Sequence, residues 1–263
     1  MDHQDSAADE LRVELRGQVL WLTIAREARR NAINSALIAG LQQAIAQAQA
    51  DPAIQAIVLT GVGSKSFCAG ADLQSGTVFQ FDHSRPYQGL ANLLREARRS
   101  TVPLIARVNG ACMAGGMGLL AMCDLAVSSE HAVFGLPEVK VGLFPAQVLA
   151  VLQDLLPRRL LLEMCLSGEP IDADRACSAG LVNYVAADDQ LDAKLDWLLA
   201  RLLDKSPAAQ RRGLYTLKHI EGLPFAQAMA FAESQIGLFG LTDDAREGQL
   251  AFREKRRPVW SGR

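Results

Sequence analysis

The chain has 263 residues, of which 49% are hydrophobic and 21% are charged, and its formal net charge is -2. These figures exclude a fibre and a disordered chain, and a typical domain size of roughly 150 residues predicts one main domain with an appendage. The balance of 27 Lys and Arg residues against 29 Asp and Glu residues leaves no strong field for nucleic acid, which we do not expect as a partner.

The apolar runs, the first residues and the cysteines together predict a soluble cytoplasmic protein. No run reaches the roughly 18 apolar residues of a membrane span. Residues 1–10 are polar and acidic, where a signal or transit peptide would be basic, and we expect a flexible tail there. The five Cys residues form no Cys-x-x-Cys pair, which argues against a disulfide framework and a zinc ribbon.

The folded part is expected to begin with two strands, at 11–15 and 19–24. Asn34 or Ser35 then caps a helix, and Asp51-Pro52 ends it. Apolar residues recur along one face of this helix at the spacing i, i+4, i+7 and i+8: Leu37, Leu41, Ala44, Ile45 and Ala48. We therefore expect an amphipathic helix on the surface of the main domain.

The next segments alternate between strand and helix patterns. The run 54–59 is short, apolar and β-branched, as in a strand buried on both faces of a parallel sheet. Similar signals give strands at 103–108, 125–127 and 181–185, and helices near 87–99, 115–122, 146–166 and 172–179. This alternation predicts an α/β fold for residues 11–188.

The last third of the sequence has helical patterns and no convincing strand. Four helices are expected near 190–204, 207–221, 224–239 and 242–256. Their apolar residues exceed what one thin layer of helices can bury on itself. We therefore expect residues 189–263 to form a helical region that packs against another subunit.

Three glycine-rich turns stand out, at 61–73, 109–118 and 134–145. The first follows a buried strand, but Lys65 follows Ser64 rather than glycine, so a P-loop is excluded. Ser66 stands where a dinucleotide fingerprint needs its third glycine. The sequence also lacks a Gly-x-Ser-x-Gly elbow, and its four His residues have no metal-ligand spacing, which argues against a hydrolase and a metal site.

Small residues in the first two turns allow backbone to approach a ligand closely. The segments 69–71, Ala-Gly-Ala, and 114–116, Ala-Gly-Gly, can point successive N–H groups at an oxyanion. Close packing of a helix start is the alternative explanation for the same glycines.

Five segments resemble, in this order, the crotonase family, which is the enoyl-CoA hydratase/isomerase group of acyl-CoA enzymes. They are RNAIN (30–34), FCAGADL (67–73), the long stretch 103–145, LSGEPIDADRACSAGLVNYV (166–185) and AREGQLAFREKR (245–256). The resemblance implies a crotonase-like core of repeated ββα units with a C-terminal α-helical trimerisation region. It also implies an acyl-CoA substrate, a homotrimer or a hexamer formed as a dimer of trimers, and no metal or redox cofactor.

The resemblance assigns roles to residues of the first two turns. The two N–H groups of the oxyanion hole would come from Ala71 and Gly115. The backbone of Ala69, Gly70, Ala71, Asp72 and Leu73, with Gln74 nearby, would cradle the adenine and pantetheine parts of CoA. A turn-forming or capping role for Asp72 is the alternative.

Cations at both ends of the chain match segments that meet CoA in the family. Arg26 and Arg29 lie in the stretch that reaches the CoA phosphates and adenine, and Lys255, with Phe252, lies in the C-terminal segment that reaches CoA across a subunit boundary. Solvated surface charge is the alternative for each.

Glu138 in the third turn is the acid/base candidate. Hydratases of the resembling family use two glutamates, but Gly118 stands at the position that matches the first. Phe134, Leu136 and Val139 flank Glu138, and such apolar surroundings would raise its pKa toward the range of a useful general base. A single carboxylate can move a double bond from position 3 to position 2 by taking a proton and returning it.

The count of acids therefore favours a single-glutamate isomerase that acts through a thioester enolate. A hydratase that uses Glu138 and an ordered water is one alternative, and a non-catalytic acyl-CoA-binding protein is another. Residues 74–90, with Phe144 and Gln147, are expected at the acyl end of the pocket. Cys68 and Cys112 lie beside the two oxyanion turns, and we interpret them as buried packing residues.

Overall fold

The computed structural model describes residues 10–72, 84 and 88–263. Its main sheet has six strands in the order β1-β2-β3-β5-β7-β10. Their bounds are β1 Leu11–Arg16, β2 Val19–Ile24, β3 Ala56–Gly61, β5 Leu104–Val108, β7 Leu125–Ser129 and β10 Tyr184–Ala186. The β1–β2 pair is antiparallel and all other neighbours are parallel, so the expected parallel sheet is confirmed.

A second, smaller sheet has the strand order β4-β6-β8-β9. Its strands are β4 Ser66–Cys68, β6 Ala111–Met113, β8 Val133–Gly135 and β9 Ile171–Asp172, and only the β8–β9 pair is antiparallel. The first three strands lie in the segments that the sequence indicated as glycine-rich turns. Each is three residues long, too short for a periodic pattern to show.

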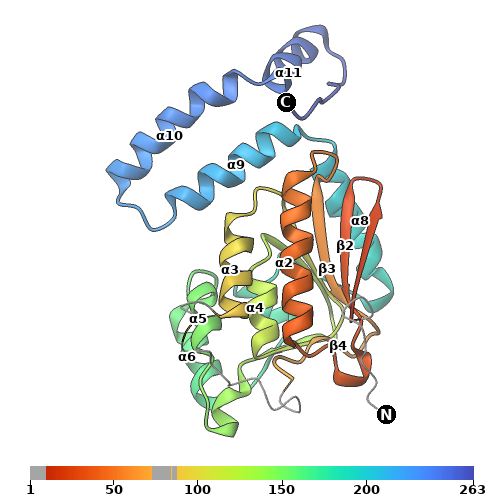
Figure 1. Ribbon diagram of the computed structural model, residues 1–263, viewed down its shortest axis with the longest axis vertical. Coiled ribbons are helices and arrows are strands. Elements are labelled where there is room, and N and C mark those ends of the chain that lie inside the picture. The colour runs from red at the N-terminus through yellow and green to blue at the C-terminus, as the bar shows by residue number, and fades with distance from the viewer. Residues whose placement is uncertain (1–9, 73–83, 85–87) are drawn as a thin grey trace.

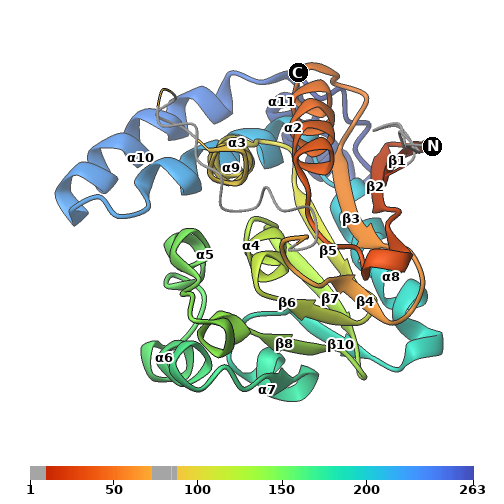
Figure 2. The ribbon, with the colours of Figure 1, turned by 60° about the horizontal axis from the view of Figure 1, so that its bottom comes forward.

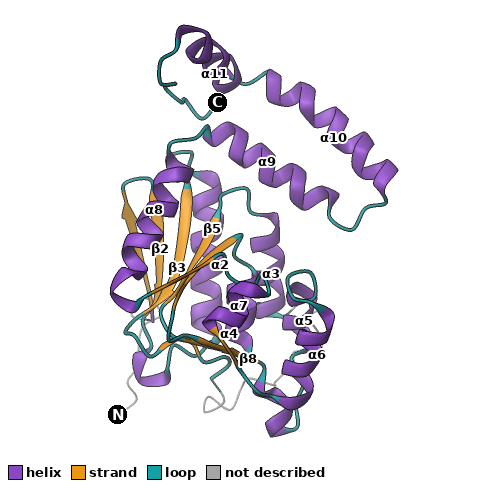
Figure 3. Cartoon of the chain, turned by 180° about the vertical axis from the view of Figure 1, so that it is seen from behind, coloured by secondary structure: helices purple, strands orange, loops and turns teal. Residues whose placement is uncertain are grey.

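Helices cover both faces of the main sheet (Figure 1 and Figure 3). The helices α2 Ser35–Ala50 and α3 Gly89–Arg99 lie on one face, and α8 Leu191–Leu203 lies on the other. The expected cap of α2 is confirmed, because Asn34 Oδ1 accepts a hydrogen bond from Leu37 N at 2.8 Å. Its buried residues are the predicted set: Leu37, Leu41, Ala44, Ile45 and Ala48.

The second half of the core contains shorter helices. They are α4 Gly115–Ala121, α5 Ala146–Leu152, α6 Arg158–Ser167 and α7 Ala173–Ser178, with 3₁₀ helices η3 Pro137–Val141 and η4 Asp188–Gln190; a further 3₁₀ helix, η1 Glu27–Arg29, precedes α2. The single helix expected at 146–166 is wrong, because the chain breaks after Leu152 and Pro157 caps α6. The strand expected at 181–185 begins only at Tyr184.

Three further helices follow the core: α9 Pro207–Ile220, α10 Phe225–Gly240 and α11 Asp243–Glu254. Figure 1 shows α10 and α11 projecting away from the sheet, whereas α8 packs against it. Lys218 Nζ of α9 pairs with Asp124 Oδ1 at 2.6 Å, which ties α9 to the core. No helix in the described ranges is long and apolar enough to cross a membrane.

Candidate active site

The first turn of the candidate site follows strand β4. Ile33 N donates to Gly70 O at 2.7 Å, and Asp72 N donates to Ile33 O at 2.9 Å. These two bonds form a parallel bridge between Ile33 and Ala71, which leaves the Ala71 N–H on the side away from Ile33. Gly70 has φ +94°, a conformation that favours glycine.

The second turn connects β6 to α4. Ala114 has φ 51° and ψ -123°, which is strained for a residue with a Cβ, and its N–H donates to Gly135 O at 2.9 Å. The helix α4 begins at the next residue, Gly115, whose N–H has no acceptor within the helix because it lies in the first turn. The strained residue thus places a free donor at the start of α4.

The two turns are packed backbone against backbone. A Cβ added to Gly70 would lie 2.7 Å from Ala114 Cβ and 3.2 Å from Gly115 N, and one added to Gly116 would lie 2.4 Å from Cys68 O. A Cβ on Gly115 would lie 3.7 Å from Ala71 N, so the structure brings Ala71 and Gly115 together. Close packing therefore accounts for these glycines and also brings the two N–H groups together, while their role as oxyanion donors stays a prediction.

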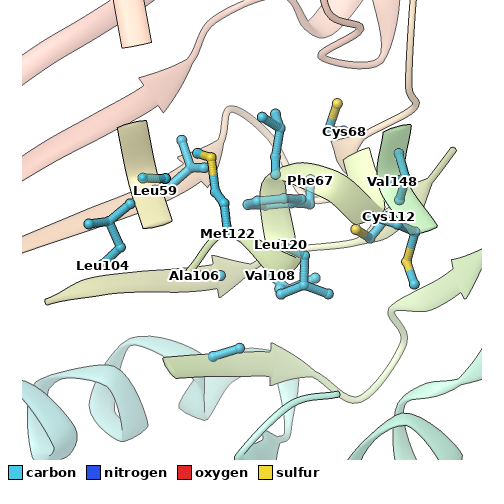
Figure 4. Close-up of a cluster of buried hydrophobic side chains, with 14 of the residues drawn as sticks. Leu59, Phe67, Cys68, Leu104, Ala106, Val108, Cys112, Leu120, Met122 and Val148 are labelled. Carbon is cyan, nitrogen blue, oxygen red and sulfur yellow. The ribbon is translucent and has the colours of Figure 1, made fainter. Parts of the chain in front are cut away.

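Cysteines fill the space behind the two turns. Cys68 and Cys112 are fully buried, and Figure 4 shows them in the apolar cluster with Phe67 and Val148. Burial raises the pKa of Cys68 to about 12 and raises that of Cys112 well above its usual value. Both thiols are neutral at physiological pH, which fits packing rather than nucleophilic chemistry.

Glu138 lies in η3, between β8 and α5, and is half-buried. Its Oε2 atom is buried and has no hydrogen-bond partner among the described residues. Desolvation raises the pKa of this carboxyl group above its ordinary value. Burial, followed by the charge of Glu138, raises the pKa of Cys165 on α6.

The loop after Glu138 is held by its own backbone. Leu143 N donates to Glu138 O at 3.0 Å, and Gly142 N donates to Val139 O at 3.2 Å. Gly142 adopts φ +75°, which turns the chain into α5. The helix η3 also packs against α6, so the backbone of Glu138 is fixed on two sides.

Gly118 lies one helical turn after Gly115 in α4. A Cβ added to Gly118 would lie 3.3 Å from Val148 Cγ2 and 3.9 Å from Leu94 Cδ2. Both neighbours are buried apolar side chains, from α5 and α3. The position that matches the first glutamate of the two-glutamate enzymes is therefore enclosed by hydrocarbon.

Arg26 and Asp72 bind each other. Arg26 Nη2 lies 2.8 Å from Asp72 Oδ2 and its Nε lies 2.9 Å from Glu10 Oε1, while Nη1 donates to Ala32 O. The two paired side chains are only 10% and 9% exposed. The ion pair with Arg26 thus holds Asp72 and the first turn in place, which supports a turn-forming role for Asp72. Contact of either residue with CoA stays a prediction.

Lys255 ends α11 with φ 54°, and its side chain is exposed, as is that of Phe252. Figure 1 and Figure 3 show α11 and the core helix α4 far apart in the folded chain. A single chain therefore does not bring Lys255 to the two turns. Arg29 is exposed in η1. Leu73 and Gln74, and nearly all of 74–87, lie outside the described residues.

The two other residues that the sequence indicated lie just before and at the start of α5, and their place at the acyl end of a pocket stays a prediction. Phe144 is 48% exposed, and Gln147 Nε2 donates to Gln88 Oε1, which joins the start of α5 to the start of α3. Figure 2 shows α4 beside β6, with α5 and α6 to one side. Sequence reasoning did not indicate Val148 and Cys165, because 146–166 read as one continuous helix with ordinary core positions.

A Ser-His-Asp cluster lies outside this site and was not predicted. Ser129 Oγ and Asp188 Oδ1 both contact Nδ1 of His131, each pair at 2.5 Å, while His131 Nε2 lies 2.8 Å from Ser64 O. A hydrolytic triad needs serine and carboxylate on opposite ring nitrogens, so this cluster is a structural link. The described residues include no group of three potential metal ligands.

The chain resembles known proteins along nearly its whole length. Residues 14–263 match the family model described as enoyl-CoA hydratase/isomerase. Enoyl-CoA hydratase EchA19 of Mycobacterium tuberculosis is 36% identical over 98% of each chain. The 2,3-dehydroadipyl-CoA hydratase of Escherichia coli is 34% identical over 97% of this chain and 99% of its own.

Solved structures give the same picture. The enoyl-CoA hydratase of Mycobacterium smegmatis superimposes with a TM-score of 0.88 at 32% identity, covering 95% of this chain and 98% of that one. Human enoyl-CoA hydratase domain-containing protein 3 gives a TM-score of 0.90 at 28% identity, covering 95% and 100%. These likenesses define the class, an α/β enzyme with the crotonase fold, and confirm the expected fold class. The chain belongs to the enoyl-CoA hydratase/isomerase family.

Proposed function

We propose that this enzyme is a single-glutamate isomerase that moves the double bond of an unsaturated acyl-CoA from position 3 to position 2. The observation that carries the proposal is the contrast between Glu138 and Gly118, the two positions that match the glutamates of the resembling family. Glu138 is half-buried with an unpartnered oxygen among the described residues, whereas the three atoms nearest to a Cβ added at Gly118 all belong to Val148 and Leu94. One carboxylate suffices for a proton transfer between two carbons of the same molecule.

The proposed reaction begins when the thioester oxygen accepts hydrogen bonds from the N–H groups of Ala71 and Gly115. Glu138 takes a proton from C2, and the electron pair of that C–H bond forms the enolate that the two donors stabilise. Glu138 then returns the same proton to C4. The electron pair of the C3=C4 bond forms the new C4–H bond, while the electrons of the enolate form the C2=C3 bond. No atom is gained or lost, so neither a water nor a cofactor takes part.

Each element of this proposal has a physical scale. Loss of one oxyanion donor typically lowers the rate by about 10²- to 10³-fold. A positioned general base contributes about 10²- to 10⁴-fold. The raised pKa of Glu138 suits the role, because a stronger base abstracts a weakly acidic C–H proton more readily.

A hydratase is the second candidate, favoured by the names of the relatives. The Mycobacterium tuberculosis and Escherichia coli relatives are both called hydratases. In this chain Glu138 would have to activate an ordered water, and another group would have to deliver the second proton. Gly118 supplies no such group, which is why we rank this candidate below isomerisation.

Incubation of the wild-type protein with 2-enoyl-CoA and 3-enoyl-CoA of several chain lengths tests the proposal. Mass spectrometry beside authentic standards identifies each product. We expect 3-enoyl-CoA to become 2-enoyl-CoA at constant mass. Addition of one water to 2-enoyl-CoA, without isomerisation, would replace our proposal by the hydratase, and CoA-ester binding without turnover would leave only a binding protein.

We also propose that the chain acts as a homotrimer, or a hexamer built from two trimers. Exposed apolar side chains on α10 and α11 support this assembly: Phe225, Met229, Ile236, Leu238 and Phe252. Lys255 would then reach the CoA of another subunit. The five free cysteines favour a cytoplasmic location, and the absence of a metal or redox cofactor stays a prediction.

A further inference from the structure

We propose that Val148 is a specificity-determining residue. Its side chain fills the space beside Gly118 and keeps that side of the site apolar, so that proton transfer within the substrate is favoured over addition of water. This inference rests on the proposed function in one respect, which is that Glu138 serves as the base.

The geometry around Gly118 carries the first step. Val148 Cγ2 and Cγ1 lie 3.3 Å and 3.9 Å from the place where a side chain at position 118 would begin. The first of these distances is shorter than an ordinary carbon–carbon contact of roughly 3.5 to 4.0 Å. A side chain at position 118 would therefore have to displace a methyl group of Val148 before it could reach the pocket.

The position of Val148 in the fold carries the second step. It lies in α5, which packs against α4 and follows directly from the loop that carries Glu138. Val148 also belongs to the same buried cluster as Cys165 on α6, and α6 packs against the 3₁₀ helix η3 that carries Glu138. Val148 is thus placed between the helix of the oxyanion donor and the loop of the base.

The side chains beside Gly118 are apolar, which bears on whether a water can be held there. A buried water requires roughly two to four polar partners, and a cavity walled by hydrocarbon stays dry. Beside Gly118, Val148 and Leu94 offer methyl groups only. These methyl groups offer no hydrogen bond to a second water or acid beside Gly118.

Two substitutions at Val148 separate polarity from volume. Val148→Thr keeps the volume and adds a hydroxyl group that can hold a water, whereas Val148→Ala opens space. Val151→Ala on the same helix is the matched control, because it removes the same two methyl groups from a half-buried position of α5. Circular dichroism and thermal unfolding verify that each variant folds.

The readout is the ratio of 2-enoyl-CoA hydration to 3-enoyl-CoA isomerisation. We expect Val148→Thr to raise this ratio by roughly tenfold or more, and Val148→Ala to raise it in the same direction, since small changes in a pocket alter discrimination by that order. Val151→Ala should leave the ratio at the wild-type value. An unchanged ratio in a folded Val148→Thr variant, or an equal rise in Val151→Ala, would overturn the inference.

Wild-type assays distinguish this inference from the proposed function. If wild-type protein hydrates 2-enoyl-CoA and does not isomerise, the proposed function fails on that result alone. The inference is then judged by the hydration rate: a rise of roughly tenfold in Val148→Thr relative to wild type supports it. No rise overturns it as well.

Discussion

At the scale of single residues, the proposed chemistry depends on a carboxyl group that the fold isolates. Glu138 has a buried oxygen without a partner among the described residues, and desolvation raises its pKa. Isolation of this kind destabilises the ionised form in the folded protein, which makes the carboxylate a stronger base. Gly118, at the position that matches the first glutamate of the two-glutamate enzymes, lies beside Val148 and Leu94. The described site therefore offers no second acid at that position.

The raised pKa of Glu138 predicts the pH dependence of the reaction. The base must be ionised, so kcat/KM should rise with pH as Glu138 loses its proton. The midpoint of this acid limb should lie above the ordinary glutamate pKa of about 4.3. A pH series of kcat/KM with 3-enoyl-CoA measures it, and a midpoint at or below the ordinary value would contradict the desolvated environment.

At the scale of elements, the contact between strand β4 and the start of α4 positions the N–H groups of Ala71 and Gly115, the proposed oxyanion donors. Gly116 lies against the Cys68 carbonyl, and Gly70 lies against Ala114. The strained backbone of Ala114 persists because its N–H bond to Gly135 O and the packing of α4 hold it. Donor geometry is thus a property of two elements and not of either loop alone.

Gly116→Ala tests this contact. A Cβ at this position would lie 2.4 Å from Cys68 O, so α4 must move away from β4 and the two donors must separate. We expect kcat to fall by about 10²- to 10³-fold, the loss typical of one oxyanion donor. Gly213→Ala in α9 is the control, because its added Cβ meets nothing within 4 Å, and it should leave kcat unchanged.

The ion pair between Lys218 and Asp124 fixes the start of the C-terminal helices. Both side chains are largely buried, and desolvation raises the pKa of Asp124 while Lys218 opposes that rise. Lys218→Met leaves the Asp124 carboxylate uncompensated and should lower the free energy of unfolding by about 3 kcal/mol. Urea unfolding measures it.

The double variant Lys218→Met/Asp124→Asn is the matched control. It removes both charges, while the amide oxygen introduced at position 124 can still accept the Leu104 N–H bond that Asp124 accepts at 2.9 Å. Stability should recover in part. A double variant less stable than Lys218→Met would show that α9 is held by something other than charge compensation.

At the scale of the whole molecule, the projecting helices expose several large apolar side chains, as a surface that binds another protein does. Phe225, Ile236, Leu241 and Phe252 are 78%, 72%, 67% and 85% exposed. They lie on or beside α10 and α11, which Figure 1 shows standing clear of the sheets. A second copy of the chain is the partner that the family resemblance implies.

Light scattering coupled to gel filtration tests the assembly. We expect a mass three or six times that of the 28.4 kDa chain. Ile236→Glu should shift the protein toward monomers, because it places a charge in the apolar surface. Gln47→Glu adds a charge to an exposed position of α2 and should leave the mass unchanged; a monomeric wild-type protein would contradict the proposed assembly.

Local periodicity predicted the long helices and strands. The short strands were not predicted, because they depend on pairing with distant segments. The buried face of α2 follows from apolar spacing alone, and all five predicted residues are buried. Strands β4, β6 and β8 take their hydrogen bonds from residues far along the chain, so three-residue segments gave no signal. Pro157 was the available sign that 146–166 contains two helices.

The candidate site was predictable where a residue resembles a family motif and not where it acts through packing. Ala71, Gly115 and Glu138 were indicated by motif resemblance, and the structure places the first two together. Val148 and Cys165 have ordinary core identities, so only their contacts reveal them. The sequence indicated Arg26 as a residue that contacts the CoA phosphates. In the structure its guanidinium forms ion pairs with Glu10 and Asp72.

Turnover of 3-enoyl-CoA by wild type and by Glu138→Gln tests the central claim most directly, with CoA-ester binding measured in both as the control. Gln has nearly the shape of Glu but cannot accept the C2 proton. We predict conversion to 2-enoyl-CoA at constant mass by wild type, unchanged binding, and a loss of about 10²- to 10⁴-fold in kcat for the variant. Isomerisation by Glu138→Gln at the wild-type rate, or a wild-type product heavier by one water, would contradict the account.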